Sequence, residues 1–274
     1  MPNEGSDYTL KDRYLDLVRD SIMGLIHPGQ YRPLLRKPAW YRPLAGLLKR
    51  VDLELVRPAH FDVARRLEGK DWPVNAESML SRQRLDNIRF CLESVLRDNV
   101  PGDIIEAGTW LGGAAIFMRA VLQAHDIKNR SVWVADSFGG LPPADTVKYP
   151  QDTGDTHSTF LDLIAPFEAV QENFRKYGLL DSQVKFLPGW FSETLEQAPI
   201  DRLAVARLDG DMYGSTIESL NALYPKLSAG GYCIIDDYNL SGARQATDDY
   251  RAAQGISESL VKIDWTGVYW RKER

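Results

Sequence analysis

The chain of 274 residues is poor in cysteine and has no long apolar run, and each shortage excludes a class of protein. Its two cysteines, Cys91 and Cys233, lie in apolar periodic segments, so we expect buried thiols and no disulfide. No uninterrupted apolar stretch approaches the roughly 18 residues that a membrane-spanning helix needs. The polar, acidic stretch MPNEGSDYTLKDRYLD does not resemble a secretory signal. We therefore expect a cytoplasmic protein without stable membrane insertion.

Positive charge is not in excess either. The chain has 33 lysines and arginines against 38 acidic residues, which gives a net charge of −5 and argues against a nucleic-acid partner. The dinucleotide fingerprint G-x-G-x-x-G is absent, which argues against a nucleotide-dependent oxidoreductase. The content of hydrophobic residues, 44%, and of charged residues, 26%, is typical of a globular protein.

The hydrophobic periodicity predicts regular alternation of strands and helices in the second part of the chain. Strands are predicted at 103–107, 131–135, 184–188, 204–209 and 231–236, and helices at 81–96, 113–124, 167–177, 192–197, 216–227 and 241–255. The tail alternates well enough for a final hairpin with its turn at 265–267. This order favours an α/β fold in which helices cover both faces of a mostly parallel sheet.

The first part of the chain is less regular. Residues 9–26 have helical spacing, with Thr9 as a possible N-cap. Residues 27–43 carry four prolines among basic and aromatic residues. This stretch is interpreted as a loop or short helices over the core, as a mobile lid, or as a membrane-surface patch. A long loop at 139–158, rich in turn-forming residues, is predicted to be functional or disordered.

Two acidic pairs stand at the ends of a predicted strand–helix–strand unit. Asp209 and Asp211 occur in LDGD, and Asp236 and Asp237 occur in IIDDY. Parallel strands joined by a helix end at the same edge of a sheet, so the four carboxylates should converge there. Because carboxylates at close range repel one another, a cation is needed among them. A divalent metal ion is the simplest answer.

A glycine-containing turn follows the first predicted strand of the sheet. In IIEAGTWLGGAA, Glu106 precedes Gly108, and Gly112 stands where a helix begins. Glycines let a backbone approach a ligand, but an acid at this place would repel a phosphate and suits an ammonium group or hydroxyls. Asp136 ends the next strand, where a carboxylate commonly binds ribose. These features indicate a nucleoside without phosphates, and S-adenosylmethionine fits; a glycine turn without a ligand is the alternative.

Several longer strings resemble one family. EAGTWLGGAA, VWVADSFGGLPP, RLDGDMYGST and AGGYCIIDDYN are similar to the macrocin O-methyltransferase family. Its members are S-adenosylmethionine-dependent sugar O-methyltransferases of antibiotic biosynthesis. The resemblance covers residues 8–26 and 70–255. It implies a Rossmann-like class I methyltransferase fold with a seven-stranded sheet in residues 78–274, and a helical and lid extension in residues 1–77. It also implies Mg²⁺ dependence, mobile lids and a homodimer.

The same resemblance divides the acidic residues by role. Asp209, Asp236 and Asp237 are expected to bind Mg²⁺ or another divalent cation, which prefers carboxylate oxygens. Asp211 is expected to accept the proton of the acceptor hydroxyl, although the sequence leaves the choice between Asp209 and Asp211 as general base open. The deprotonated oxygen would then attack the methyl group in line.

Further residues are expected around the cofactor. Ser137, after the ribose-binding carboxylate, should help to form the pocket, and Trp190 should stack beside the adenine. Met79 and Ser81 are expected near the methionine end of the cofactor on the strength of the resemblance alone.

The predicted function is metal-dependent methyl transfer from S-adenosylmethionine to a sugar hydroxyl of a glycosylated small molecule. A catechol-type O-methyltransferase acting on an aromatic vicinal diol is the enzymatic alternative. A binding protein without activity is a further one. The identity of the acceptor should depend on residues 27–58 and 139–160, because fold and cofactor site are shared by enzymes with many different acceptors.

Overall fold

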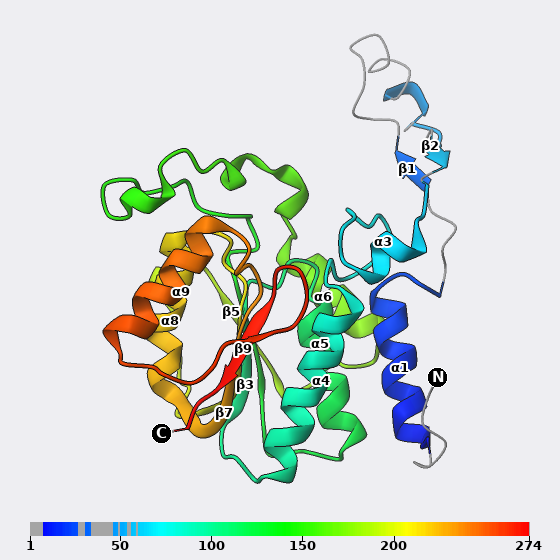
Figure 1. Cartoon of the computed structure of the whole chain (residues 1–274). Coiled ribbons are helices and arrows are strands. Elements are labelled where there is room, and N and C mark those ends of the chain that lie inside the picture. Colours follow the sequence, from blue (N-terminus) through cyan, green and yellow to red (C-terminus); the bar gives the residue numbers. More distant parts are fainter. Residues whose placement is uncertain are drawn as a thin grey trace.

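A seven-stranded sheet forms the centre of the protein, seen here in a computed structural model that describes residues 8–26, 31–33, 46–48, 50–53, 56–58 and 60–273 (Figure 1). The strand order is β5-β4-β3-β6-β7-β9-β8. Strands β3 to β7 run parallel, and β9 is antiparallel to β7 and β8. The strands are β3 (Asp103–Ala107), β4 (Val132–Asp136), β5 (Val184–Pro188), β6 (Leu203–Leu208), β7 (Leu227–Ile235), β8 (Val261–Lys262) and β9 (Val268–Arg271). The predicted mostly parallel α/β fold is confirmed, including the hairpin at the end of the chain.

Helices cover both faces of this sheet. In Figure 1, α8 and α9 lie on one side and α4, α5 and α1 on the other. The α-helices that the structure describes over five or more residues are α1 (Leu10–Ile22), α3 (Val63–Leu67), α4 (Arg82–Arg97), α5 (Gly113–Ala124), α6 (Phe167–Lys176), α8 (Tyr213–Leu223) and α9 (Ser241–Ala253), and α7 (Phe191–Thr194) is a single turn. A short pair of antiparallel strands, β1 (Tyr31–Pro33) and β2 (Val56–Pro58), stands apart from the sheet.

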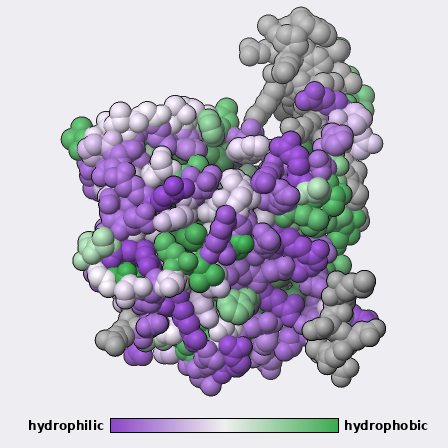
Figure 2. Space-filling view, viewed as in Figure 1, coloured by the Kyte–Doolittle hydropathy of each residue, from purple (hydrophilic) through white to green (hydrophobic). Residues whose placement is uncertain are grey.

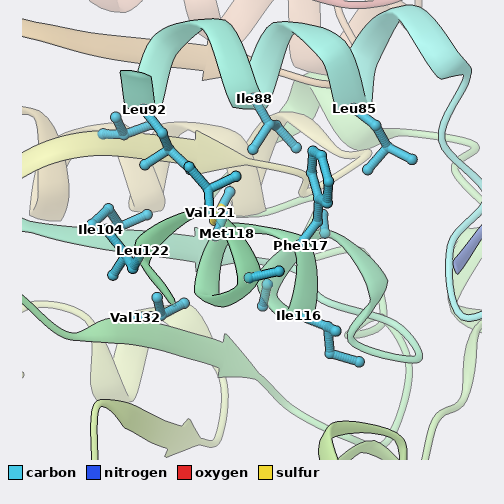
Figure 3. Close-up of a cluster of buried hydrophobic side chains, with 14 of the residues drawn as sticks. Leu85, Ile88, Leu92, Ile104, Ile116, Phe117, Met118, Val121, Leu122 and Val132 are labelled. Carbon is cyan, nitrogen blue, oxygen red and sulfur yellow. The ribbon is translucent and has the colours of Figure 1, made fainter. Parts of the chain in front are cut away.

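The strands separate two hydrophobic cores. Successive side chains of a strand point to opposite faces, so Ile104 packs toward α4 and α5 while its neighbour Ile105 packs toward α8. Helix α5 is buried over almost its whole length. Figure 3 shows the first core, in which α4 meets α5 and the sheet through Leu85, Ile88, Leu92, Ile104, Ile116, Phe117, Met118, Val121, Leu122 and Val132.

Helix α1 belongs to the same core. Its buried residues Leu15, Val18 and Ile22 join the cluster formed by α4 and α5. Thr9 caps the helix as predicted and accepts a hydrogen bond from the N–H of Asp12. A boundary at residue 77 stays a prediction. The proline-rich stretch 27–43 lies mostly outside the described residues.

The visible surface is largely polar. Figure 2 shows hydrophilic residues over most of this face, with hydrophobic residues in small groups. In the part of the chain that the structure describes, no helix has the length and apolar character needed to cross a membrane.

Truncating Phe117 should destabilise the protein strongly. Its side chain is fully buried between α4 and the sheet, so Phe117→Ala leaves a cavity and should lower the free energy of unfolding by about 3–5 kcal/mol. Denaturant unfolding followed by circular dichroism measures the change. The control is Phe90→Ala on α4, whose ring is 48% exposed and should cost less than about 2 kcal/mol. Equal losses for the two variants would contradict the assignment of the core.

Candidate active site

A cavity of about 750 Å³ opens where the parallel strands end. Residues that follow β3, β4, β6 and β7 line it, together with the segment before α4 and the loop after β4. This is where open α/β sheets bind ligands. Ten of the residues singled out from the sequence line this one cavity: Met79, Glu106, Gly108, Asp136, Ser137, Trp190, Asp209, Asp211, Asp236 and Asp237.

Gly108 brings the turn after β3 against the turn after β6. Its φ is +88°, and a Cβ atom at this position would overlap the carbonyl oxygen of Asp209. Only glycine allows this approach. Gly112 also has a φ of +88°, but a Cβ atom there would meet Val170 of α6 at 2.9 Å. Gly112 therefore allows close packing at the start of α5, and its predicted contact with the cofactor stays a prediction.

Glu106 holds the glycine-containing turn after β3 in place. One carboxylate oxygen accepts hydrogen bonds from Thr109 Oγ1 and the Ala115 N–H, each at 2.8 Å, and the other lies 2.5 Å from Arg207 Nη1. Helix α5 has no capping side chain at Gly112, so Glu106 satisfies one of its free N–H groups instead. Burial raises the pKa of Glu106 to about 7, and Arg207 opposes this shift. The carboxylate thus supports the turn, and its predicted contact with an ammonium group or hydroxyls of the cofactor stays a prediction.

Asp136 joins the turns after β3 and β4. Its carboxylate accepts hydrogen bonds from the backbone N–H groups of Thr109 at 2.7 Å, Trp110 at 3.3 Å and Phe138 at 2.7 Å. Three backbone donors hold this side chain in one orientation at the cavity wall. The position is the one in which a carboxylate binds ribose hydroxyls in α/β folds.

Ser81 is not among the residues that line the cavity. It is fully buried, it caps α4, and its hydroxyl donates to Asp264 at 2.6 Å. Met79, two residues earlier, does line the cavity. Ser137 also lines it while donating to the Gly140 carbonyl at 2.6 Å, and Trp190 does so from the start of α7.

Three carboxylates form a close group where β6 and β7 end. We call this part of the cavity, with Asp209, Asp211, Asp236 and Asp237, the acidic edge. Asp209, Asp211 and Asp237 each offer an oxygen atom, and these atoms lie within 4.8 Å of one another. The backbone of Asp211 has a φ of +56°, and its N–H donates to Asp237 at 3.4 Å. Burial and the charge of Asp209 raise the pKa of Asp211 to about 7 and that of Asp237 well above its usual range. The group therefore has the electrostatics of a cation site.

Asp236, which we predicted as a third cation ligand, pairs with two buried arginines. One carboxylate oxygen bonds Arg84 of α4, and Oδ1 lies 2.6 Å from Arg207 Nη2. Although burial acts to raise its pKa, the charges of Arg207 and Arg84 lower it. Oδ1 is buried and makes no aligned hydrogen bond, in spite of the close ion pair.

The sequence interpretation missed both arginines. Arg207 is the single charged residue in the otherwise apolar β6, and it is 1% exposed. A lone charged residue in an apolar strand was the sequence signal from which a buried ion pair could have been predicted. Arg84 lies on the buried face of α4 and also pairs with Asp264 at 3.0 Å.

Asp152 was missed as well. It belongs to the loop after β4 and accepts hydrogen bonds from the N–H groups of Tyr213 at 2.7 Å and Gly214 at 2.9 Å. It thus satisfies two free N–H groups at the start of α8, which begins at Tyr213, three residues before the predicted start. This buried contact ties the 139–158 loop to the acidic edge.

Comparisons with known proteins agree with this geometry. The sequence model of the macrocin O-methyltransferase family matches residues 11–272. The mycinamicin III 3''-O-methyltransferase of Micromonospora griseorubida is 48% identical over 94% of this chain and 96% of its own. The demethyldecarbamoylnovobiocin O-methyltransferase of Streptomyces niveus is 52% identical over 76% of this chain and 80% of its own.

Solved structures give the same result. The O-methyltransferase NovP superposes with a TM-score of 0.83 at 44% identity, covering 96% of this chain and all of that one. The calicheamicin methyltransferase CalS11, at 18% identity and a TM-score of 0.53, shows only the shared fold. The chain is therefore an O-methyltransferase with the class I fold of S-adenosylmethionine-dependent enzymes, and it belongs to the macrocin O-methyltransferase family.

Proposed function

We propose that this enzyme transfers a methyl group from S-adenosylmethionine to a sugar hydroxyl of a glycosylated small molecule of antibiotic type. One observation carries the proposal: a single cavity is lined both by Gly108 and Asp136 and by the acidic group of Asp209, Asp211 and Asp237. Methyl transfer requires donor and acceptor in line within one space. Two relatives, a mycinamicin III 3''-O-methyltransferase and a rhamnosyl-tetracenomycin-C 4'-O-methyltransferase, support a sugar as the acceptor.

A divalent cation such as Mg²⁺ fits the acidic edge. Asp209 and Asp237 offer close oxygen atoms, and Asp236 Oδ1 is buried and makes no aligned hydrogen bond, although Arg207 Nη2 lies 2.6 Å away. We assign these three as the residues that would hold the cation, since hard cations prefer carboxylate oxygens. When bound, the cation would orient the acceptor hydroxyls and lower their pKa.

The remaining residues have separate tasks in this proposal. Asp211, placed beside Asp209 and Asp237 in the cavity, accepts the proton of the attacking hydroxyl. Asp136 binds the ribose of the donor, and Trp190 flanks the adenine. Loop 139–158, held by Asp152, lines the acceptor side of the cavity.

We also propose that the enzyme works in the cytoplasm as a homodimer. Apolar side chains exposed on α1, Leu10 at 83% and Leu17 at 60%, are compatible with a subunit contact, and light scattering coupled to size-exclusion chromatography tests it. A monomer at micromolar concentration would remove this part of the proposal.

Activity should depend on both the sugar and the cation. With S-adenosylmethionine and Mg²⁺, we expect glycosides to be methylated, while their aglycones and simple catechols are not. EDTA should abolish turnover, and excess Mg²⁺ should restore it. If the cation binds only the folded protein, Mg²⁺ at a hundred times its Kd stabilises it by about 2.7 kcal/mol, which denaturant unfolding detects. Turnover of catechols without turnover of glycosides would instead support the catechol-type alternative, and full activity in EDTA would remove the cation.

A further inference from the structure

We propose that Arg207 is a positioning residue that couples donor binding to cation binding. This inference rests on the proposed function and gives a role to a residue that the proposed function leaves without one. It is carried by the geometry of one buried guanidinium group that contacts three carboxylates, Glu106, Asp209 and Asp236.

Strand register places these groups together. Arg207 of β6 stands opposite Glu106 of β3 and opposite Ile234 of β7. Side chains two residues apart on a strand share a face, so Asp236 follows Ile234 onto the same face of the sheet as Arg207. Helix α4 covers that face and adds Arg84. Bulk solvent is thus excluded, and Arg207 is 1% exposed.

One side of the guanidinium controls the donor site. Its Nη1 atom lies 2.5 Å from Glu106, whose other oxygen holds Thr109 and the start of α5. The N–H of Thr109 in turn donates to Asp136. A displacement of Glu106 would therefore reach the ribose-binding carboxylate through two hydrogen bonds.

The other side of the guanidinium controls the cation site. Its Nη2 atom lies 2.8 Å from Asp209 Oδ2 and 2.6 Å from Asp236 Oδ1. Two of the proposed ligands are thus held next to each other by one nitrogen atom. The rigid planar guanidinium holds Glu106 and the Asp209–Asp236 pair on two separate nitrogen atoms, whereas the ammonium group of lysine presents all its donors from one point.

Donor binding and cation binding are coupled because each ligand restrains the same network of side chains around Arg207. A donor analogue that fixes the turn after β3 also fixes Glu106 and hence Arg207. A cation that fixes Asp209 does the same from the other side. The first ligand removes the residual motion of this network, so the second ligand loses less conformational entropy on binding, which gives positive cooperativity. By linkage, each ligand must strengthen the binding of the other by the same factor.

Calorimetry with S-adenosylhomocysteine and Mn²⁺ tests this inference. In the unmodified enzyme, we expect saturating Mn²⁺ to tighten S-adenosylhomocysteine binding by about fivefold or more, in the range typical of coupled sites. In Arg207→Lys the factor should fall to within about twofold of one, and Mn²⁺ affinity alone should fall by about tenfold or more. The matched control is Arg119→Lys, another buried arginine, which pairs with Asp181 away from the cavity and should leave the factor unchanged.

A second variant keeps the test decisive if Arg207→Lys does not fold. Glu106→Gln removes the donor-side charge but leaves Arg207 on Asp209 and Asp236. It should lower the coupling factor while Mn²⁺ affinity without S-adenosylhomocysteine changes by less than about threefold. Unchanged coupling in a folded variant of either kind overturns the role of Arg207. Failure of the unmodified enzyme to bind Mn²⁺ would overturn the cation site of the proposed function instead.

Discussion

Replacing Asp209 by asparagine is expected to lower kcat/KM by about 10³-fold or more, equivalent to about 4 kcal/mol of transition-state stabilisation. Asp209 is the one residue that belongs both to the close carboxylate group and to the ion pairs of Arg207. The amide keeps the shape of the side chain but loses the charge that a cation requires. Affinity for S-adenosylhomocysteine without a cation should change by less than about threefold, because we assign the donor to the turn after β3 and to Asp136, and not to the Asp209 side chain.

Steady-state kinetics that follow the formation of the methylated glycoside measure kcat/KM. Calorimetry measures the affinity for S-adenosylhomocysteine. Asp201→Asn is the control, since its side chain is 94% exposed and lies outside the cavity lining. Turnover within tenfold of the unmodified enzyme would show that Asp209 neither holds a cation nor takes part in the reaction.

Asp211→Asn should have the second largest effect. As the proposed proton acceptor, Asp211 contributes about 10²–10⁴-fold to kcat, and the asparagine variant should lose this factor. Its affinity for S-adenosylhomocysteine and for Mn²⁺ should stay within about threefold, because the cation is assigned to Asp209, Asp236 and Asp237 and not to Asp211.

Asp236→Asn provides the matched comparison. It should lose Mn²⁺ affinity, whereas Asp211→Asn should keep it. The opposite pattern, with Mn²⁺ binding lost in Asp211→Asn and retained in Asp236→Asn, would exchange the two roles. That outcome would make the close group of Asp209, Asp211 and Asp237 the cation site.

Much of the fold could be predicted because it depends on local patterns. Apolar strands alternate with helices of period 3.6, and the parallel order then places each strand end at one edge. For this reason the predicted convergence of the four acids on one cavity agrees with the structure. Strands β3 and β5 have the predicted bounds.

The partners of each side chain could not be predicted in the same way. Whether Asp236 turns toward a cation or toward Arg84 depends on a helix that is 152 residues away in the sequence. Asp152 caps α8 from 61 residues away, and the turn-rich loop around it gave no sign of this contact. Ser81 shows the same limit, because its hydroxyl is engaged by Asp264 from the final hairpin.

The buried attachment of the 139–158 loop to α8 through Asp152 has a consequence for the diversification of this scaffold. The side chain of Asp152 is buried and accepts hydrogen bonds from two backbone N–H groups of α8. Much of the loop around it faces solvent or the cavity. We expect that such a loop can be replaced by one of different sequence, provided that an acidic residue remains at position 152. Because we propose that this loop lines the acceptor side of the cavity, we expect its sequence to alter the choice of acceptor while methyl donation stays constant.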